Sequence, residues 1–264
     1  MINNILYKML EISIIISILC LIFSFLMKME SSKYLTETRI VPGLRYKVGG
    51  KLYEVPKLEL IGVSYLLKEK FMLKIRKLYT DIYNFFEEKG IEAWVSGGTL
   101  LGFVRHKTFM PWDDDIDMHT SSENRVMMFS KEFRKELNSR GIETLLMAGS
   151  NGERTFYKGG LRLRFSGSRN PVMDIFFVDR SSRKTRKIEN WKGMNVEYNK
   201  KEVWDTGDVF PINKTKIDDL NVNLPNNPEK VLSAQYGNDF GEKMFCQGAP
   251  HYLAYDLLNI IWNY

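Results

Sequence analysis

The sequence predicts a protein of the α/β (α+β) class, with a mixed β-sheet flanked by helices and a transmembrane helix at its N-terminus. Three observations lead to this prediction: an apolar N-terminal run, segments of helical periodicity that alternate with short β-type segments, and a composition suited to a folded core. With 264 residues, of which 44% are hydrophobic and 13% aromatic, the chain can bury one sizeable core. A disordered protein is excluded.

The first element is an apolar segment, Ile12 to Met27, that contains no charged residue. Its length is near the lower end of the roughly 17 to 25 residues that span a bilayer, and Met9 and Leu10 extend it. A cleaved signal peptide is the alternative, but residues 27–32 lack a small-x-small cleavage site. We therefore interpret residues 1–28 as an uncleaved signal anchor.

A polar stretch over residues 29–57 follows the anchor, and turn residues interrupt it at Pro42-Gly43, Gly49-Gly50 and Pro56. This composition is typical of a stem or loop rather than of a folded domain. The rest of the chain, residues 58–264, contains no internal repeat or low-complexity tract. We interpret it as a single domain.

This domain opens with a helix, because apolar residues recur at helical spacing until Gly90 stops the pattern. The apolar residues are Phe71, Ile75, Leu78, Ile82 and Phe85. A strand over residues 91–95 leads into Gly97-Gly98. A helix that begins near Thr99 would direct the positive end of its dipole at a bound phosphate.

A second group of elements lies further along the chain. The pattern Thr120-Ser121-Ser122-Glu123 is typical of a capping box and predicts a helix that closes at Gly141. Strands are expected over residues 142–146, 155–165 and 172–178. Near the end, Asn227-Pro228-Glu229 combines a cap, a first-turn proline and an acidic residue, and predicts the start of a helix.

The most informative residues form an acidic strand between these groups. In a β-strand, side chains alternate between the two faces, so Asp113, Asp115 and Asp117 share one face, whereas Ile116 and Met118 face the core. Carboxylates a few Å apart repel one another, and a proton or a metal must neutralise them. Hard cations prefer oxygen ligands, so the expected cofactor is Mg²⁺ or Mn²⁺.

Each feature taken alone has a simpler explanation. An acidic run can be a solvated surface turn, and two glycines can form an ordinary connection between a strand and a helix. Here the run follows Pro111-Trp112 and is interleaved with apolar residues, which a solvated turn does not need. Because the glycines and the aspartates occur together, we interpret them as one site for phosphoryl chemistry on a nucleotide.

These motifs resemble the signature of the LicD and fukutin family. The matching segments, in order, are residues 96–106, residues 111–117, Met173-Asp174-Ile175-Phe176, Val209-Phe210-Pro211, residues 224–228 and Tyr236-Gly237. They extend over most of the part that follows the anchor, so the resemblance does not depend on one motif.

The resemblance implies a nucleotidyltransferase-like fold and a phosphotransferase that works with a metal. Such an enzyme transfers a phospho-alcohol, of the ribitol phosphate or phosphocholine type, from a CDP-activated donor to a glycan hydroxyl and releases CMP. Two other transferases stay open: a nucleotidyltransferase that transfers NMP, and an Asp-x-Asp glycosyltransferase in glycan synthesis. A catalytically silent, membrane-anchored binding protein is the third class, and the full acidic set argues against it.

The expected catalytic residues are Asp115, Asp117 and Asp174, and the same three are the expected metal ligands. Asp115 and Asp117 are two positions apart on one strand, so one ion can contact both. Asp174, from a neighbouring strand, either completes the metal site or accepts the proton of the acceptor hydroxyl. Asp113 is a further ligand or supports the ligands, and Asp114 is expected to point away.

The phosphates of the donor are expected to contact Gly97, Gly98 and Thr99, since a side chain at either glycine would block close approach of the backbone. Arg105 either binds phosphate through its planar fork or forms a surface salt bridge. The histidines His106 and His119 receive no catalytic role here. Arg162 and Arg164 alternate on a strand and either face substrate anions or, as we expect, line the solvent side of that strand.

The net charge of +6 and a pI near 9.1 favour polyanionic partners. The expected partners are the CDP-activated donor, a glycan or glycoprotein acceptor and a membrane; nucleic acid is not expected, because no nucleic-acid-binding motif occurs. Lysines lie on both sides of the anchor and leave its orientation open. A single-pass type II protein facing the lumen of the Golgi or endoplasmic reticulum is therefore expected only by analogy with the family.

Overall fold

The computed structural model describes the protein in ten segments. They are residues 38–41, 45–48, 51–54, 58–61, 69–110, 113–146, 160–169, 171–192, 195–238 and 240–241. The predicted signal anchor, residues 1–28, lies outside them. None of the helices within the ten segments is both long and apolar enough to cross a bilayer.

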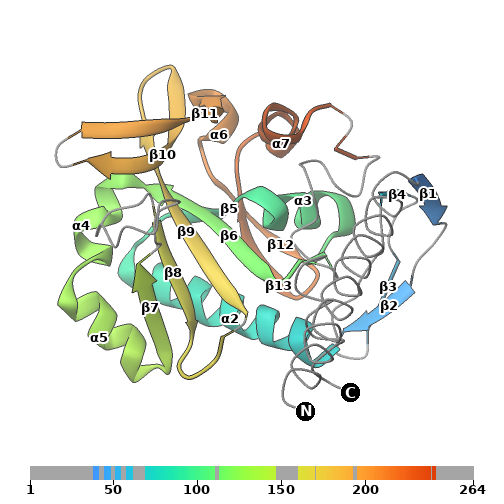
Figure 1. Ribbon diagram of the computed structural model, residues 1–264, viewed down its shortest axis with the longest axis horizontal. Coiled ribbons are helices and arrows are strands. Elements are labelled where there is room, and N and C mark those ends of the chain that lie inside the picture. The colour runs from blue at the N-terminus through green and yellow to red at the C-terminus, as the bar shows by residue number, and fades with distance from the viewer. Residues whose placement is uncertain are drawn as a thin grey trace, which may run out of the picture.

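A mixed seven-stranded sheet forms the centre of the fold (Figure 1). Its strands are β5 (Ala93–Val95), β6 (Asp115–Ser121), β7 (Ile142–Leu146), β8 (Gly160–Phe165), β9 (Val172–Arg180), β10 (Lys184–Lys192) and β11 (Asn195–Asp205). Five strands follow the order β11-β10-β9-β6-β5, while β8 pairs with β9 and carries β7. The β6–β9 pair is parallel and the others are antiparallel, which confirms the predicted mixed sheet.

Helices cover the sheet, with α2 and α5 below it and α3, α6 and α7 above it in the view of Figure 1. Their bounds are α2 Glu69–Lys89, α3 Gly97–His106, α4 Arg125–Met128, α5 Lys131–Ser139, α6 Thr206–Val209 and α7 Pro228–Tyr236. Four of the five apolar positions that predicted the first helix, Ile75, Leu78, Ile82 and Phe85, are fully inaccessible to solvent on α2, and Phe71 is partly buried against the core. Burial of this stripe is the main source of stability for such a helix.

The segment that follows β6 differs from the single helix predicted up to Gly141. It is divided into a 3₁₀ turn (η1, Ser122–Asn124), α4 and α5. Ser121 Oγ accepts a hydrogen bond from the Glu123 N–H, and Ser130 Oγ accepts one from the Phe133 N–H at 3.1 Å. Ser130 therefore caps a new helix, and a side chain that caps in this way ends the preceding helix.

Two hairpins and several short strands were not predicted. The hairpins are β10–β11 and β12–β13 (Asn213–Ile217 and Leu220–Leu224). The described part of the expected stem contains β1 (Thr38–Val41), β2 (Arg45–Val48) and β3 (Lys51–Glu54), and β1 pairs with β4 (Leu58–Ile61) across the boundary expected at residue 57. Lysine-rich strands such as β12, exposed along most of its length, lack the apolar alternation on which strand prediction depends.

Candidate active site

The acidic strand β6 has the alternation that its sequence predicts. Ile116 and Met118 are buried in the core, at 0% and 1% exposure, whereas Asp115 and Asp117 are half-buried on the opposite face. The Ser96 N–H donates to the Asp117 carbonyl oxygen at 3.0 Å, so the end of β5 is joined to the middle of β6. The two carboxylates therefore have fixed backbone positions beside the glycine turn.

The third carboxylate comes from β9. Because β6 and β9 are parallel and in register, Asp117 lies opposite Asp174, which is 4% exposed. Asp115, Asp117 and Asp174 each offer one oxygen atom, and these atoms lie within 4.8 Å of one another. Such spacing suits a single divalent ion with oxygen ligands after a small inward movement of the side chains.

The electrostatics of this carboxylate cluster indicate unbalanced negative charge. Desolvation raises the pKa of Asp115 to about 6, with Asp114 and Asp174 adding to the rise. Desolvation also raises the pKa of Asp117 well above its ordinary value, and the charges of Asp115 and Asp174 contribute. A cation held among the three side chains would remove this penalty, so the residues present fit a divalent metal.

Arg162 on β8 contacts the cluster directly. The antiparallel β8–β9 register places it opposite Asp174, and its Nε and Nη2 each donate to one Asp174 oxygen at 2.6 Å. The expectation that Arg162 only lines the solvent side of its strand is therefore wrong. Arg164, two positions along, pairs instead with Glu143 on β7 at 2.5 Å.

The glycine turn packs against the aspartates. Gly97 has a left-handed backbone (φ +52°), and a Cβ atom built there would overlap the Asp117 carboxylate. A Cβ atom at Gly98 would overlap the carboxylate of Asp113, and the Gly98 N–H donates to Asp117 Oδ2 at 3.3 Å. Both glycines are thus required for close approach, and the groups in contact with them here are carboxylates.

Thr99 and Asp113 take supporting positions. The Asp117 N–H donates to Thr99 Oγ1 at 2.9 Å, and Thr99 is only 2% exposed, so this hydroxyl holds β6 against α3. Asp113 lies against Gly98 and forms a side-chain hydrogen bond with Asp115, which lowers the pKa of Asp115. Asp113 is not one of the three residues whose carboxylate oxygens lie within 4.8 Å of one another.

Arg105 lies at the other end of α3. It lies eight positions after Gly97, which corresponds to about 12 Å along a helix axis. Its guanidinium donates to the Phe240 carbonyl oxygen at 2.8 Å, to His106 Nε2 at 3.0 Å and to Met110 Sδ at 3.3 Å. These contacts fix the Arg105 side chain at the end of α3, and its role in binding phosphate stays a prediction.

Lys187 on β10 is a second cation near the site, and no sequence motif identifies it. Its ammonium group lies 3.8 Å from the centre of the Phe176 ring and 2.6 Å from Glu202 Oε2, and its charge lowers the pKa of Asp117. Lys187 lies on the unpredicted β10–β11 hairpin. Its position next to β9 follows only from strand pairing.

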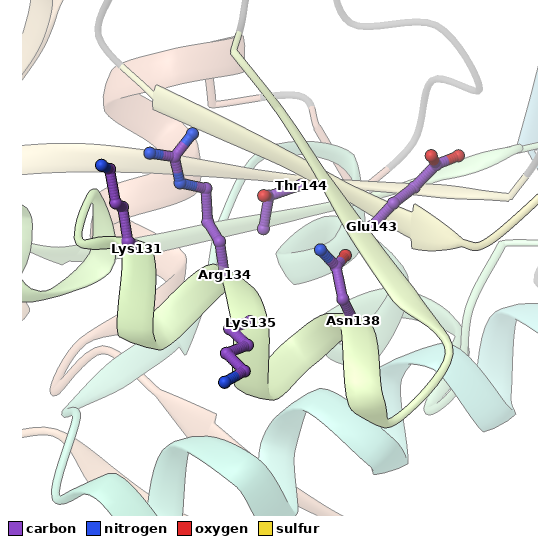
Figure 2. Close-up of a pocket in the computed structure, with 6 residues that line it drawn as sticks. All are labelled: Lys131, Arg134, Lys135, Asn138, Glu143 and Thr144. Carbon is purple, nitrogen blue, oxygen red and sulfur yellow. The ribbon is translucent and has the colours of Figure 1, made fainter.

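A groove of about 550 Å³ lies elsewhere, between α5 and β7 (Figure 2). Its lining residues are Lys131, Arg134, Lys135, Asn138, Glu143 and Thr144. It contains none of the three clustered aspartates and no part of the glycine turn. The candidate active site is therefore the carboxylate cluster beside the glycine turn, and this groove is a separate feature.

Comparison with protein families gives a match over the same elements. The model of the family described as LicD/FKTN/FKRP, nucleotidyltransferase domain, matches residues 90–227, just over half of the chain. The match extends from the end of α2 to the start of α7 and contains all three clustered aspartates and the glycine turn.

Three relatives illustrate how similar the chain is to known proteins. It is 23% identical over 173 residues to uncharacterized protein RP689 of Rickettsia prowazekii, which covers 66% of this chain and 58% of that protein. Identity is 34% over 98 residues to the lipopolysaccharide cholinephosphotransferase LicD of Haemophilus influenzae, with 35% and 37% covered. Identity is 32% over 60 residues to human ribitol 5-phosphate transferase FKRP, with 21% and 12% covered. The chain thus spans at most 58% of the length of these relatives.

Among solved structures, the lincosamide antibiotic adenylyltransferase LnuA with bound lincomycin aligns with a TM-score of 0.36 and 12% identity, over 61% of this chain and 82% of that chain. A similarity of this size does not establish a common fold. The fold is therefore defined by the order and pairing of the strands in the seven-stranded sheet.

Proposed function

The chain belongs to the family of LicD/FKTN/FKRP nucleotidyltransferase domains, and we propose that it is a phosphotransferase that moves a phospho-alcohol from a CDP-activated donor to a glycan hydroxyl. The names of two relatives, a cholinephosphotransferase and a ribitol 5-phosphate transferase, support this class of reaction. The donor alcohol would be of the choline or ribitol type, and CMP would be the leaving group.

One observation carries the proposal: three carboxylates from two parallel strands meet beside a glycine turn at the start of α3. Asp115, Asp117 and Asp174 would hold a Mg²⁺ or Mn²⁺ ion. When bound, such an ion supplies positive charge that stabilises the oxygens of a transferring phosphate.

The protein's own residues would orient the substrates around these carboxylates. The first turn of α3 directs backbone N–H groups and the positive end of its dipole toward the site, which favours an anionic donor. Lys187 adds a positive charge on the same face of the sheet, where its ammonium lies over Phe176. Arg162 donates one hydrogen bond to each oxygen of Asp174, and each oxygen keeps a second lone pair with which Asp174 would accept the proton of an acceptor hydroxyl or bind the ion.

Product analysis tests the proposal. The full-length chain is incubated with Mn²⁺ or Mg²⁺, a panel of CDP-alcohols that includes CDP-choline and CDP-ribitol, and simple sugars as acceptors. We expect release of CMP that depends on the metal and disappears in Asp117→Asn. Absence of CMP with every donor would contradict the proposal.

A nucleotidyltransferase that transfers NMP is the second candidate, and the description of the matching family favours it as the alternative. It would use a nucleoside triphosphate and release pyrophosphate. An Asp-x-Asp glycosyltransferase would instead release a nucleotide from a sugar nucleotide. Incubation of the same chain with CTP and with sugar nucleotides, followed by detection of pyrophosphate and nucleotides, separates these reactions from phospho-alcohol transfer.

We also propose that the apolar segment over residues 12–27 anchors the protein in a membrane, because it contains no charge over a length close to that of a bilayer-spanning helix. The membrane of the Golgi or endoplasmic reticulum stays a prediction from the family resemblance. Fractionation with alkaline carbonate distinguishes an integral protein, which stays in the pellet, from one that is released.

A further inference from the structure

The ion pair between Arg162 and Asp174 joins a cation directly to the carboxylate cluster. Two parallel hydrogen bonds of 2.6 Å, from Nε and Nη2, occupy both oxygens of Asp174. This bidentate arrangement is the strongest geometry that an arginine and a carboxylate can adopt. The Arg162 side chain is 40% exposed, whereas that of Asp174 is 6% exposed, so the guanidinium approaches the cluster from the open side.

The influence of Arg162 extends beyond its direct partner. Its charge lowers the pKa of Asp115, and in turn Asp115 and Asp117 contribute, after Asp174, to raising the pKa of the Arg162 guanidinium. The other nearby cation, Lys187, has its own counter-ion in Glu202. Among the described residues, Arg162 is therefore the cation that is hydrogen-bonded to a member of the carboxylate cluster, Asp174.

We infer that Arg162 is the built-in counter-ion of the carboxylate cluster and competes with a divalent cation for Asp174, so that it weakens the binding of metal to the protein alone. This inference rests on the metal site of the proposed function. Arg162 is a positioning residue in this role, because it acts through Asp174.

The physical basis is a balance of two effects. A guanidinium that holds Asp174 in place organises one ligand in advance, which favours metal binding. Its positive charge a few Å from the ion opposes binding, and at this distance the repulsion between a single and a double charge is large even in a moderately polar environment. The charge effect should win, because β6 and β9 already fix the three aspartates through their backbone register.

This balance predicts that the affinity of the protein for the metal increases when the donor is bound. The phosphates of a CDP-alcohol bring further oxygen ligands and negative charge, which compensate for the repulsion by Arg162. The ion would then bind more tightly together with the donor than to the protein alone.

The test is a calorimetric titration of the 264-residue chain with Mn²⁺ alone at pH 8. Arg162→Gln removes the charge and keeps a hydrogen-bond donor, and we expect it to bind Mn²⁺ about tenfold more tightly than the unmodified protein. Arg162→Lys keeps the charge without the fork and should stay within about threefold of the unmodified protein.

Arg164→Gln is the matched control. It changes the net charge by the same amount on the same strand, but its partner is Glu143 rather than a member of the cluster. We expect its Mn²⁺ affinity to stay within about twofold of the unmodified protein, because Arg164 is paired with Glu143 and makes no hydrogen bond to Asp174. Thermal unfolding of each variant verifies that it is folded.

The outcomes separate this inference from the proposed function. Unchanged or weaker Mn²⁺ binding by folded Arg162→Gln, with binding by the unmodified protein intact, would overturn the counter-ion role and leave the metal site standing. Binding by Arg162→Gln alone would support the counter-ion role in its strongest form. No binding by either protein would overturn both.

Discussion

Asp117 on β6 and Asp174 on β9 lie opposite each other on parallel strands, although they are far apart in the sequence. Parallel strands require a crossover connection, and here the intervening chain provides α4, α5, β7 and β8. The same connection brings Arg162 on β8 to the other side of β9. β9 thus places Asp174 between Asp117 on one neighbouring strand and Arg162 on the other.

Asp117→Asn removes one charge of the cluster with little change in volume. We expect it to reduce Mn²⁺ binding and CMP release by at least about 100-fold, because a metal ligand is lost. The metal-free variant should unfold at the same or a higher temperature, since repulsion within the cluster falls. Asp205→Asn removes an exposed carboxylate, 67% accessible, and serves as the control with unchanged metal binding. Near-normal turnover of Asp117→Asn at saturating Mg²⁺ would refute the assignment.

Gly97→Ala places a methyl group against the Asp117 carboxylate at a positive φ. We expect the free energy of unfolding to fall by about 1 to 3 kcal/mol. We also expect the molecules that stay folded to release CMP more slowly than the unmodified protein. Gly102→Ala provides the comparison, because its added Cβ would lie 2.8 Å from the Thr108 carbonyl oxygen, away from the cluster. It should lower stability in urea unfolding and leave turnover per folded molecule unchanged. Equal turnover by both variants would show that close packing at Gly97 is not needed for activity.

Thr99→Val removes the hydroxyl that accepts the Asp117 N–H. The donor is then left unsatisfied in a buried position, which costs about 1 to 3 kcal/mol in the free energy of unfolding. Thr99→Ser keeps the acceptor and should recover most of the stability. Urea unfolding of the two variants checks this, and equal stabilities would mean that the hydroxyl contributes nothing.

His106 predicts how stability depends on pH. Burial, followed by the charge of Arg105, lowers its pKa in the folded protein from 6.5 to about 3. Below pH 6.5 the unfolded chain binds the extra proton, so the free energy of unfolding should fall by roughly 1.4 kcal/mol per pH unit from this group, until the folded protein also titrates near pH 3.

His106→Gln removes this contribution and keeps an acceptor for the Arg105 N–H. The measurement is the difference between the urea unfolding free energies of the two proteins at pH 7 and pH 5. The variant should lose less stability over this interval than the unmodified protein does. Parallel pH profiles would mean that His106 has the same pKa in the folded and the unfolded protein.

Local patterns predicted the elements that carry the site. The period-two alternation placed Asp115 and Asp117 on the face opposite the core residues Ile116 and Met118. The glycines predicted the passage from β5 into α3, which begins at Gly97, two residues before the predicted Thr99. The family resemblance, based on residues 173–176, indicated Asp174. For Arg105 the sequence left phosphate binding and a surface salt bridge open, and the structure adds a hydrogen bond to the Phe240 carbonyl oxygen that no local pattern predicts.

Sequence alone determined which residues share a strand face, where α2 ends, where α7 begins and that oxygen ligands for a hard cation are present, because these properties depend on a few neighbouring residues. Only the tertiary structure decided that Arg162 holds Asp174, that Lys187 lies over Phe176 and that β10 and β11 form a hairpin. Such contacts depend on the register between strands distant in the chain, which is set by the packing of the whole core and not by any local period.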